Sequence, residues 1–219
     1  MTEQATASFV AERSRIYWLL SHFFLEQPDR SFINELNEWL VQGNTSGDAG
    51  TLQVFNDVSS ALSLLQSDEA LLGLQKEYTR LFAGLRKNDA LPPPYECVFR
   101  EGRLAGDITV DVNHHYALAG FADIYPEAGP QDHLGVELRF MSLLCYEEHS
   151  AETLGDIGKV LALRNQQREF LDRHLLRWVP DYCVMLGQES RVDFYSGIAT
   201  LTAYSLKTDS DMLERLVAA

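Results

Sequence analysis

Apolar residues recur at intervals of three and four along almost the whole chain, and no stretch alternates strictly between apolar and polar residues. Between residues 7 and 26 one such stripe is formed by Ile16, Leu19, Leu20, Phe23 and Phe24. This spacing matches the helical repeat of about 3.6 residues, whereas a strand needs a period of about two. The sequence therefore predicts an all-α fold, a single globular domain of many helices.

The same pattern predicts the remaining helices. They are expected over residues 31–43, 52–65, 68–82, 108–118, 131–148, 152–163, 166–186, 193–206 and 209–217. Pro28 ends the first helix, and Ser31 is the expected N-cap of the second. A polar loop is expected over 43–50, and Ser67 and Gly84 are expected to open and close the helix between them.

Three successive prolines at 92–94 forbid a helix and set an extended path. Tyr95 and Phe99 follow directly and bring two aromatic rings back to the protein. Core packing is the ordinary fate of such rings. A proline corner with two aromatics could instead line an apolar groove that receives a peptide.

Glycine and proline are concentrated once more between two convincing helices, at Gly120, Pro126, Gly129 and Pro130. We interpret residues 120–130 as a hinge between N-terminal helices (1–119) and C-terminal helices (131–219) of the one domain. A plain surface loop is the alternative, and composition alone favours it.

The charge balance excludes some classes of partner. The 219 residues include 18 Lys and Arg against 32 Asp and Glu, a net charge of -14, and the pI is near 4.7. Nucleic-acid affinity depends on clustered Lys and Arg, so we expect no nucleic-acid partner and favour a basic one. No apolar run approaches the roughly 18 residues that span a bilayer, so membrane insertion is not expected.

Cysteine usage and the N-terminal sequence indicate the compartment. Cys97, Cys145 and Cys183 are odd in number and lack metal-like spacing, which argues against a disulfide framework. The first residues show no basic, apolar and small-residue pattern of a secretory signal. We therefore expect a cytoplasmic protein.

Catalytic signatures are missing from the sequence: there is no HExxH, GxSxG, GxxxxGK[ST] or GxGxxG. A di-iron bundle needs Glu-x-x-His on two helices, and none occurs. His133 and Glu137 lie four residues apart, but one such pair cannot close a metal site. We expect no catalytic residue, metal or cofactor, and keep a carboxylate- or histidine-based metal-dependent enzyme as a remote alternative.

Asp132 lies where the helix at 131–148 is expected to begin. It could cap that helix or complement its positive end, worth about 0.5 to 2 kcal/mol. Alternatively, Asp132 and His133 form a polar pair at the mouth of a groove, where the carboxylate receives a basic ligand group. The local sequence favours the cap.

Several ordered motifs resemble a known family. They are Glu77-Tyr78-Thr79-Arg80-Leu81-Phe82-Ala83-Gly84, Pro93-Pro94-Tyr95-Glu96, Pro130-x-Asp132-His133-Leu134-Gly135-x-Glu137-Leu138-x-Phe140-Met141, Leu175-Leu176-Arg177-Trp178-Val179-Pro180 and Phe194-Tyr195-x-Gly197-x-Ala199-x-Leu201-Thr202. In this order they resemble the TorD/DmsD family of redox-enzyme maturation chaperones over nearly the whole chain.

The resemblance implies a cytoplasmic, non-catalytic chaperone for a molybdopterin-containing reductase of the trimethylamine N-oxide or dimethyl sulfoxide type. Such a chaperone binds the twin-arginine signal peptide and the apo-enzyme, and delays export until cofactor insertion. An assembly chaperone of a membrane-bound nitrate reductase is the related alternative. Weak guanine-nucleotide binding has been attributed to the family, but the sequence contains no phosphate-binding loop.

The resemblance also implies site residues. The signal-peptide-binding positions that match the family are Pro93, Pro94, Tyr95, Glu96, Pro130, Asp132 and His133. The corner here is Pro-Pro-Tyr where other members have a Trp, and Cys97 replaces the usual Ser. The loop before Pro130 resembles a hinge through which some members exchange their C-terminal helices, so a swapped homodimer is expected beside the monomer.

Overall fold

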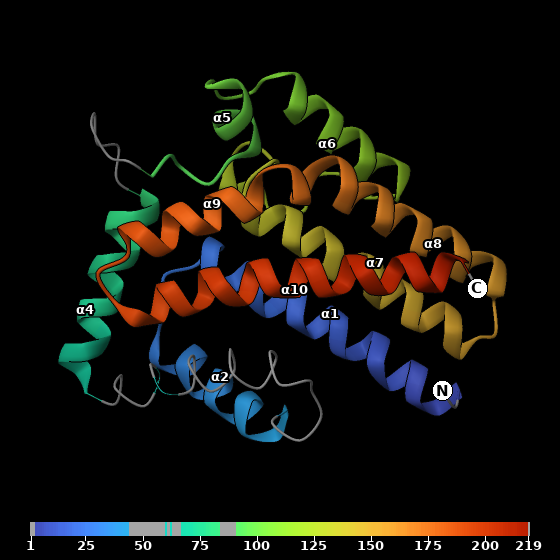
Figure 1. The fold of residues 1–219 in the computed structure, drawn as a ribbon, viewed down its shortest axis with the longest axis horizontal. Coiled ribbons are helices and arrows are strands. Elements are labelled where there is room, and N and C mark those ends of the chain that lie inside the picture. The colour runs from blue at the N-terminus through green and yellow to red at the C-terminus, as the bar shows by residue number, and fades with distance from the viewer. Residues whose placement is uncertain (1–2, 44–59, 61, 63–66, 84–90, 219) are drawn as a thin grey trace. The chain divides into compact units, whose positions relative to one another are not determined.

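The computed structural model describes residues 3–43, 60, 62, 67–83 and 91–218. In these residues the regular structure is helical (Figure 1). One isolated bridge joins Tyr95 and His133. The all-helical prediction is confirmed. None of the described helices is long and apolar enough to cross a membrane. Of the loop expected at 43–50 and the helix expected at 52–65, only Gly43, Ser60 and Leu62 are among the described residues, and the closing Gly84 is not.

The helices are labelled in Figure 1. The α-helices are α1 (Glu3–Leu25), α2 (Arg30–Gly43), α4 (Asp68–Tyr78), α5 (Glu96–Glu101), α6 (Asp107–Leu118), α7 (Leu134–Thr153), α8 (Ile157–Phe170), α9 (Leu176–Glu189) and α10 (Asp193–Ala218). Two π-helical turns, η2 (Thr79–Ala83) and η4 (Leu171–Leu175), and one 3₁₀ turn, η3 (Pro126–Ala128), complete the described structure.

Some predicted helix starts agree with the structure, and others differ. Ser67 caps α4 as predicted, because its hydroxyl accepts from the Ala70 N–H at 3.1 Å. The predicted cap Ser31 is wrong, since Asp29 Oδ1 accepts from the Phe32 N–H at 2.8 Å and α2 begins at Arg30. Helix α7 begins at Leu134 rather than at 131.

Two predicted helix breaks are absent. The chain is helical from Ile157 to Glu189, through α8, η4 and α9, where the sequence predicted an interruption after 163. Helix α10 is continuous through the polar residues near 207–209. Asp209, where a new helix was expected to begin, is buried, and its Oδ1 accepts from Arg13 Nε at 2.6 Å. A paired charge can lie inside a helix that is buried on that side.

The chain divides into two compact units. The first comprises Met1–Leu25, Pro94–Val179 and Ser205–Ala219, and the second comprises Glu26–Pro93 and Pro180–Tyr204. The 120–130 segment lies inside the first unit, and its role as a hinge stays a prediction.

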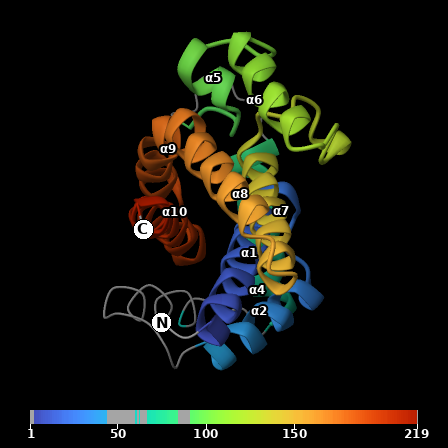
Figure 2. The same ribbon diagram turned by 90° about the vertical axis from the view of Figure 1, so that its right-hand side faces the viewer.

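In the first unit α1 packs along α7 (Figures 1 and 2). Gly135 permits the contact, because a Cβ there would lie 2.5 Å from Leu25 Cγ and 2.9 Å from the Ser21 carbonyl oxygen. Arg13 of α1 is 4% exposed and bonds Asp209, Glu148 and Gln167. This buried charge network therefore links α1, α7, α8 and the end of α10.

The second unit has its own polar connection. Glu77 of α4 pairs with Arg80 at 2.6 Å and accepts from the Arg191 N–H at 2.8 Å. Arg80 also donates to the Glu189 carbonyl at 2.6 Å. The Arg80 side chain lowers the pKa of Glu77, so the carboxylate is charged at neutral pH. These contacts fix α4 and η2 against the segment between α9 and α10.

Candidate functional site

The two motifs that the sequence placed in one site are joined by backbone hydrogen bonds. The Leu134 N–H donates to the Pro94 carbonyl at 2.8 Å, and the Glu96 N–H donates to the Asp132 carbonyl at 2.9 Å. Tyr95 and His133 form the antiparallel bridge between them. We call residues 94–97 and 130–134 the paired motif segments. Their backbone bonds bring the Pro-Pro-Tyr-Glu corner and the Pro-x-Asp-His block into one element.

Asp132 holds the start of α5. Its side chain is fully buried; Oδ2 accepts from the Cys97 N–H at 2.8 Å and Oδ1 accepts from the Thr109 hydroxyl at 3.0 Å. Together with its carbonyl, Asp132 therefore accepts from the first two N–H groups of α5. The prediction that Asp132 caps the helix which follows it is wrong, because it caps a helix thirty-five residues earlier.

His133 supplies the cap of α7. Its Nδ1 accepts from the Gly135 N–H at 3.1 Å. Burial lowers the pKa of His133 to about 4, which keeps the ring neutral and leaves Nδ1 able to accept at neutral pH. Asp132 and His133 therefore cap different helices, although they are neighbours in the sequence.

Tyr95 is the partly exposed aromatic of the paired motif segments. Its hydroxyl donates to the Ala128 carbonyl at 2.7 Å, and its ring lies edge-on to His133 with centroids 4.9 Å apart. Pro130 is partly exposed, and Pro94 is buried. Pro93, which belongs to the second unit, is exposed. Tyr95 thus connects the corner to the 120–130 segment and offers part of its ring to solvent.

Gln131 organises the loop before the Pro-x-Asp-His block, a role that no pattern in the sequence indicates. Its Oε1 accepts from the N–H groups of Ile124 and Tyr125 at 2.9 and 3.2 Å. Its Nε2 donates to the carbonyls of Tyr125 and Gly129 at 3.1 and 2.9 Å. One buried amide therefore closes the 124–129 loop. A single sequence cannot show these contacts, because all the partners of the Gln131 side chain are backbone groups, which every residue type supplies.

Glu96 of the paired motif segments and Glu137 of α7 are both buried carboxyl groups. Glu96 is fully buried, pairs with Arg100, and lies 2.8 Å from His174 Nδ1. Glu137 accepts from Trp178 Nε1 at 3.3 Å. Burial raises the pKa of Glu137 well above its usual range, and the nearby Glu96 and Asp132 carboxylates raise it further. Both effects favour the protonated form of Glu137.

The His133 and Glu137 pair does not form a metal site, since His133 Nδ1 is used as a cap and Glu137 is bonded to Trp178. A different set comes together elsewhere in the first unit. Asp111, His115 and His174 each present a ligand atom, and these atoms lie within 4.8 Å of one another. The sequence indicated no metal ligands among them, because the third residue is distant in the chain.

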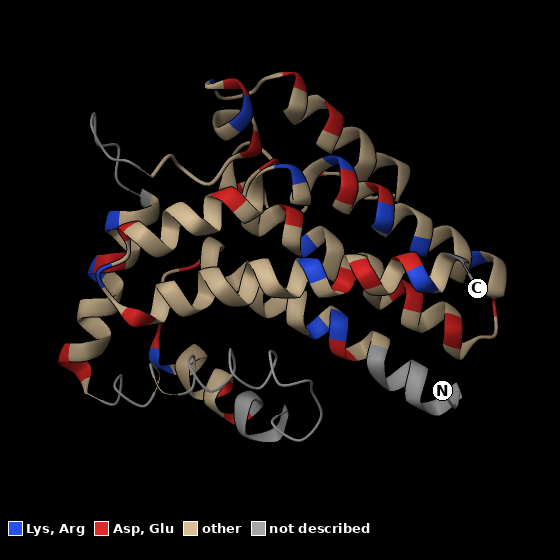
Figure 3. Ribbon diagram, viewed as in Figure 1, with Lys and Arg blue, Asp and Glu red and all other residues tan. Residues whose placement is uncertain are grey.

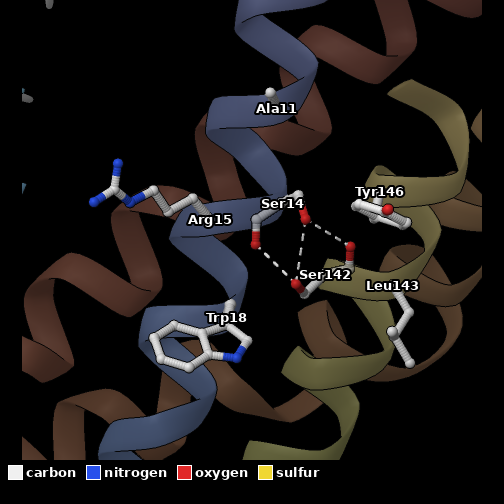
Figure 4. Close-up of a pocket in the computed structure, with 7 residues that line it drawn as sticks. All are labelled: Ala11, Ser14, Arg15, Trp18, Ser142, Leu143 and Tyr146. Carbon is white, nitrogen blue, oxygen red and sulfur yellow. Dashed lines mark hydrogen bonds between the residues drawn. The ribbon is translucent and has the colours of Figure 1, made fainter. Parts of the chain in front are cut away.

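A shallow groove of about 420 Å³ lies between α1 and α7 (Figure 4). It is lined by Ala11, Ser14, Arg15, Trp18, Ser142, Leu143 and Tyr146. The Ser142 hydroxyl donates to the Ser14 carbonyl at 2.8 Å, and Arg139 lies over the Trp18 ring, 5.4 Å from its centroid. Trp18 and Tyr146 are 36% and 61% exposed, so the groove presents two aromatic rings outside the paired motif segments.

Comparisons with known proteins identify the family. A family model described as the nitrate reductase delta subunit matches residues 25–184. The chain belongs to the TorD/DmsD family of redox-enzyme maturation chaperones. Chaperone protein TorD of Vibrio atlanticus is 25% identical over 212 residues, with 95% of this chain and 97% of the relative covered. TorD of Vibrio cholerae is 27% identical over 211 residues, with 94% of both chains covered.

The fold agrees with a solved structure. A protein described as a redox enzyme maturation protein from Archaeoglobus fulgidus matches with a TM-score of 0.52 and 22% identity, covering 92% of this chain and 93% of its own. Because the curated relatives are chaperones, the chain is a maturation chaperone and not an enzyme, as predicted. The metal-dependent enzyme alternative is thereby removed.

Proposed function

We propose that this TorD/DmsD-type chaperone binds the twin-arginine signal peptide of a molybdopterin-containing reductase precursor in the cytoplasm. The client is of the trimethylamine N-oxide or dimethyl sulfoxide reductase type, and the chaperone holds the apo-enzyme until its cofactor is inserted before export. The observation that carries this proposal is the pairing of the Pro94–Tyr95 and Asp132–His133 backbones. It supports a single binding element made from the predicted site residues.

The surface of this element suits a peptide that is basic and apolar in turn. Tyr95 offers part of an aromatic ring, and its hydroxyl bonds to Ala128, whose neighbour Glu127 is exposed. Asp123, in the same loop, is also exposed. We propose that Tyr95 contacts the apolar part of the signal and that Glu127 and Asp123 meet the arginines. A net charge of -14 adds long-range attraction for such a ligand.

The buried residues of the predicted site have a supporting role in this proposal. Glu96, Asp132 and His133 are each no more than 7% exposed, and both carboxylates and His133 Nδ1 already bond within the protein. They position the paired motif segments for the peptide. This differs from the sequence hypothesis in which Asp132 itself receives the basic group.

Figure 3 shows Asp and Glu spread over the described helices and interspersed with Lys and Arg. The proposal therefore depends on two particular acids of the 121–130 loop, Asp123 and Glu127, rather than on one large acidic face. Specific recognition of two adjacent guanidinium groups is the expected result, since a carboxylate can bond a guanidinium with two parallel hydrogen bonds.

Titration calorimetry with a synthetic twin-arginine signal peptide tests the proposal. The variants are Tyr95→Ala and the double change Asp123→Asn with Glu127→Gln, and each should weaken binding by about 1 to 3 kcal/mol. A twin-lysine peptide should bind more weakly and should not distinguish wild type from the acid variant as strongly. The loss in the acid variant should shrink at high salt, because exposed charge pairs are screened.

Trp18→Ala is the matched control, because Trp18 is a partly exposed aromatic in the α1–α7 groove. It should leave peptide affinity unchanged. If Trp18→Ala abolishes binding while Tyr95→Ala does not, the peptide binds in the groove and the proposal is wrong.

An assembly chaperone of a membrane-bound nitrate reductase is the second candidate, supported by the description of the matching family model. Parallel titrations with N-terminal peptides of a trimethylamine N-oxide reductase, a dimethyl sulfoxide reductase and a nitrate reductase catalytic subunit separate the two. Preference for the nitrate reductase peptide would reject the first client class.

A further inference from the structure

A further cluster of ionisable groups in the first unit comprises Asp111, His115 and His174. Asp111 and His115 are four residues apart on α6, so they share one face of the helix. His174 comes from η4, and one ligand atom of each residue lies within 4.8 Å of the others. We propose that Asp111, His115 and His174 bind a divalent transition-metal ion.

His174 supplies the independent observation. It is 1% exposed, its Nδ1 lies 2.8 Å from Glu96 Oε2, and its Nε2 is buried without a hydrogen-bond partner. A buried polar atom that lacks a partner is costly, and few native structures leave one without a reason. The Nε2 atom lies 3.6 Å from Asp111 Oδ2, so it is directed into the cluster.

The surroundings of His174 are those of a metal ligand. Glu96 is fully buried, and when Nδ1–H donates to it the lone pair remains on Nε2. Metal-binding histidines characteristically donate their other ring N–H to a carboxylate, which fixes the tautomer and makes the ring a stronger ligand. Glu96 is held in turn by Arg100.

The donor set indicates the class of ion. Two imidazoles and one carboxylate favour zinc, nickel, copper or iron, whereas magnesium and calcium prefer oxygen ligands alone. Ligand atoms around a tetrahedral zinc ion are about 3.4 Å apart, from bonds of about 2.0 to 2.1 Å. The Nε2–Oδ2 distance of 3.6 Å is already close to this separation. A cavity of about 450 Å³ gives the ion access and room for water; it is lined by Asp107, Ile108, Asp111, His174 and the three arginines Arg100, Arg173 and Arg177.

Arg173 competes for the same carboxylate. Its Nη2 lies 2.9 Å from Asp111 Oδ2, and 52% of its side chain is exposed. Because the ion pair is exposed, the Arg173 guanidinium can rotate away from Asp111 at small cost. The Asp111 carboxylate is then able to bind the metal ion. Removing this positive charge should therefore strengthen metal binding, a result that a purely structural ion pair would not give.

The experiment uses the full chain after treatment with a chelator that is then removed. Zinc and nickel are titrated by calorimetry, and thermal unfolding is measured with and without each ion. We expect one ion per chain and a higher melting temperature, because a ligand that binds only the folded state stabilises it. Magnesium should not compete.

Variants separate this site from other metal-binding groups. Asp111→Asn and His174→Gln should each weaken zinc or nickel binding by about 100-fold or more, while Arg173→Gln should strengthen it. His114→Gln is the matched control, since His114 is exposed on the same helix. This variant should bind zinc and nickel as tightly as the wild-type chain. Asp111 is partly exposed, so its variant should fold even if His174→Gln does not.

Wild-type affinity for both ions that is unchanged in Asp111→Asn would overturn the proposal. So would the absence of any bound zinc or nickel when the wild-type chain is titrated to millimolar ion, or loss of binding in His114→Gln alone.

Discussion

The carboxylate of Asp132 accepts a hydrogen bond from the backbone N–H of Cys97 at 2.8 Å, across thirty-five residues of sequence. The Asp132 carbonyl accepts from Glu96 N–H in the same turn. Helix α5 has no side-chain cap of its own at Tyr95, so the capping groups come from another part of the chain. The position of Tyr95 therefore depends on Asp132.

Asp132→Asn should destabilise the fold. The amide keeps one acceptor but loses the charge that strengthens both bonds of a fully buried group, so the free energy of unfolding should fall by about 1 to 2 kcal/mol. Urea unfolding measures it. If stability is unchanged while affinity for a twin-arginine peptide falls, Asp132 contacts the peptide directly and the positioning role is rejected.

Gly135→Ala should separate α1 from α7. The new Cβ would lie 2.5 Å from Leu25 Cγ and 2.9 Å from the Ser21 carbonyl oxygen, and a backbone atom cannot move away cheaply. We expect a loss of about 1 to 3 kcal/mol in thermal or urea unfolding. The matched control is Gly158→Ala in α8, where the nearest atom is 3.6 Å away, and this change should be neutral or slightly stabilising. Equal effects of the two changes would contradict the close approach.

Glu137 should make stability fall with rising pH. Burial raises its pKa above the ordinary 4.5, so the folded protein keeps a proton that the unfolded chain releases. Because the unfolded state then binds fewer protons, this contribution to the unfolding free energy decreases from about pH 4.5 up to the folded pKa. Glu137→Gln replaces the titrating carboxyl group with an amide, which does not bind or release a proton in this pH range.

The stability of Glu137→Gln relative to wild type should therefore increase with pH, by up to about 1.4 kcal/mol per pH unit. Urea unfolding at about pH 5 and about pH 8 measures the difference. Glu214→Gln, at an exposed position of α10, is the control. A difference for Glu137→Gln that does not vary with pH would show that Glu137 is charged in the fold.

Gln131→Ala should open the 120–130 segment. The side chain closes the loop with four bonds to backbone groups of Ile124, Tyr125 and Gly129. Without these bonds, less free energy is needed to extend the loop. The helices that follow can then pack on a second copy of the chain through the same contacts that they make within one chain. Sedimentation should show a larger dimer fraction than wild type. A monomer at every concentration would count against the hinge prediction.

Local patterns in the sequence were sufficient to predict those helix boundaries that depend only on residues close together in the chain. The apolar stripe and Pro28 locate the end of α1, and Ser67 caps α4 as its sequence indicates. These two features need only the helical period and the residue types at helix ends. The expectation that Tyr95 and Asp132 belong to one site came from the resemblance to the family, and it stays a prediction.

The remaining features depend on contacts between distant residues. Helix α10 continues through Asp209 because Arg13, 196 residues away, pairs with it. Asp132 caps α5 rather than the helix beside it, and His174 joins Asp111 only through the packing of η4 near α6. Tertiary contacts override local preference at each of these positions.

The central claim is that the paired motif segments receive the signal peptide, and hydrogen exchange of the free and peptide-saturated chain tests it most directly. The amides of Glu96, Cys97 and Leu134 bond across the segments, so peptide binding should slow their exchange together with that of residues 121–130. Protection in these segments, weaker with a twin-lysine peptide, is the predicted result. Protection confined to the α1–α7 groove, with residues 94–97 and 121–134 unchanged, would contradict the account.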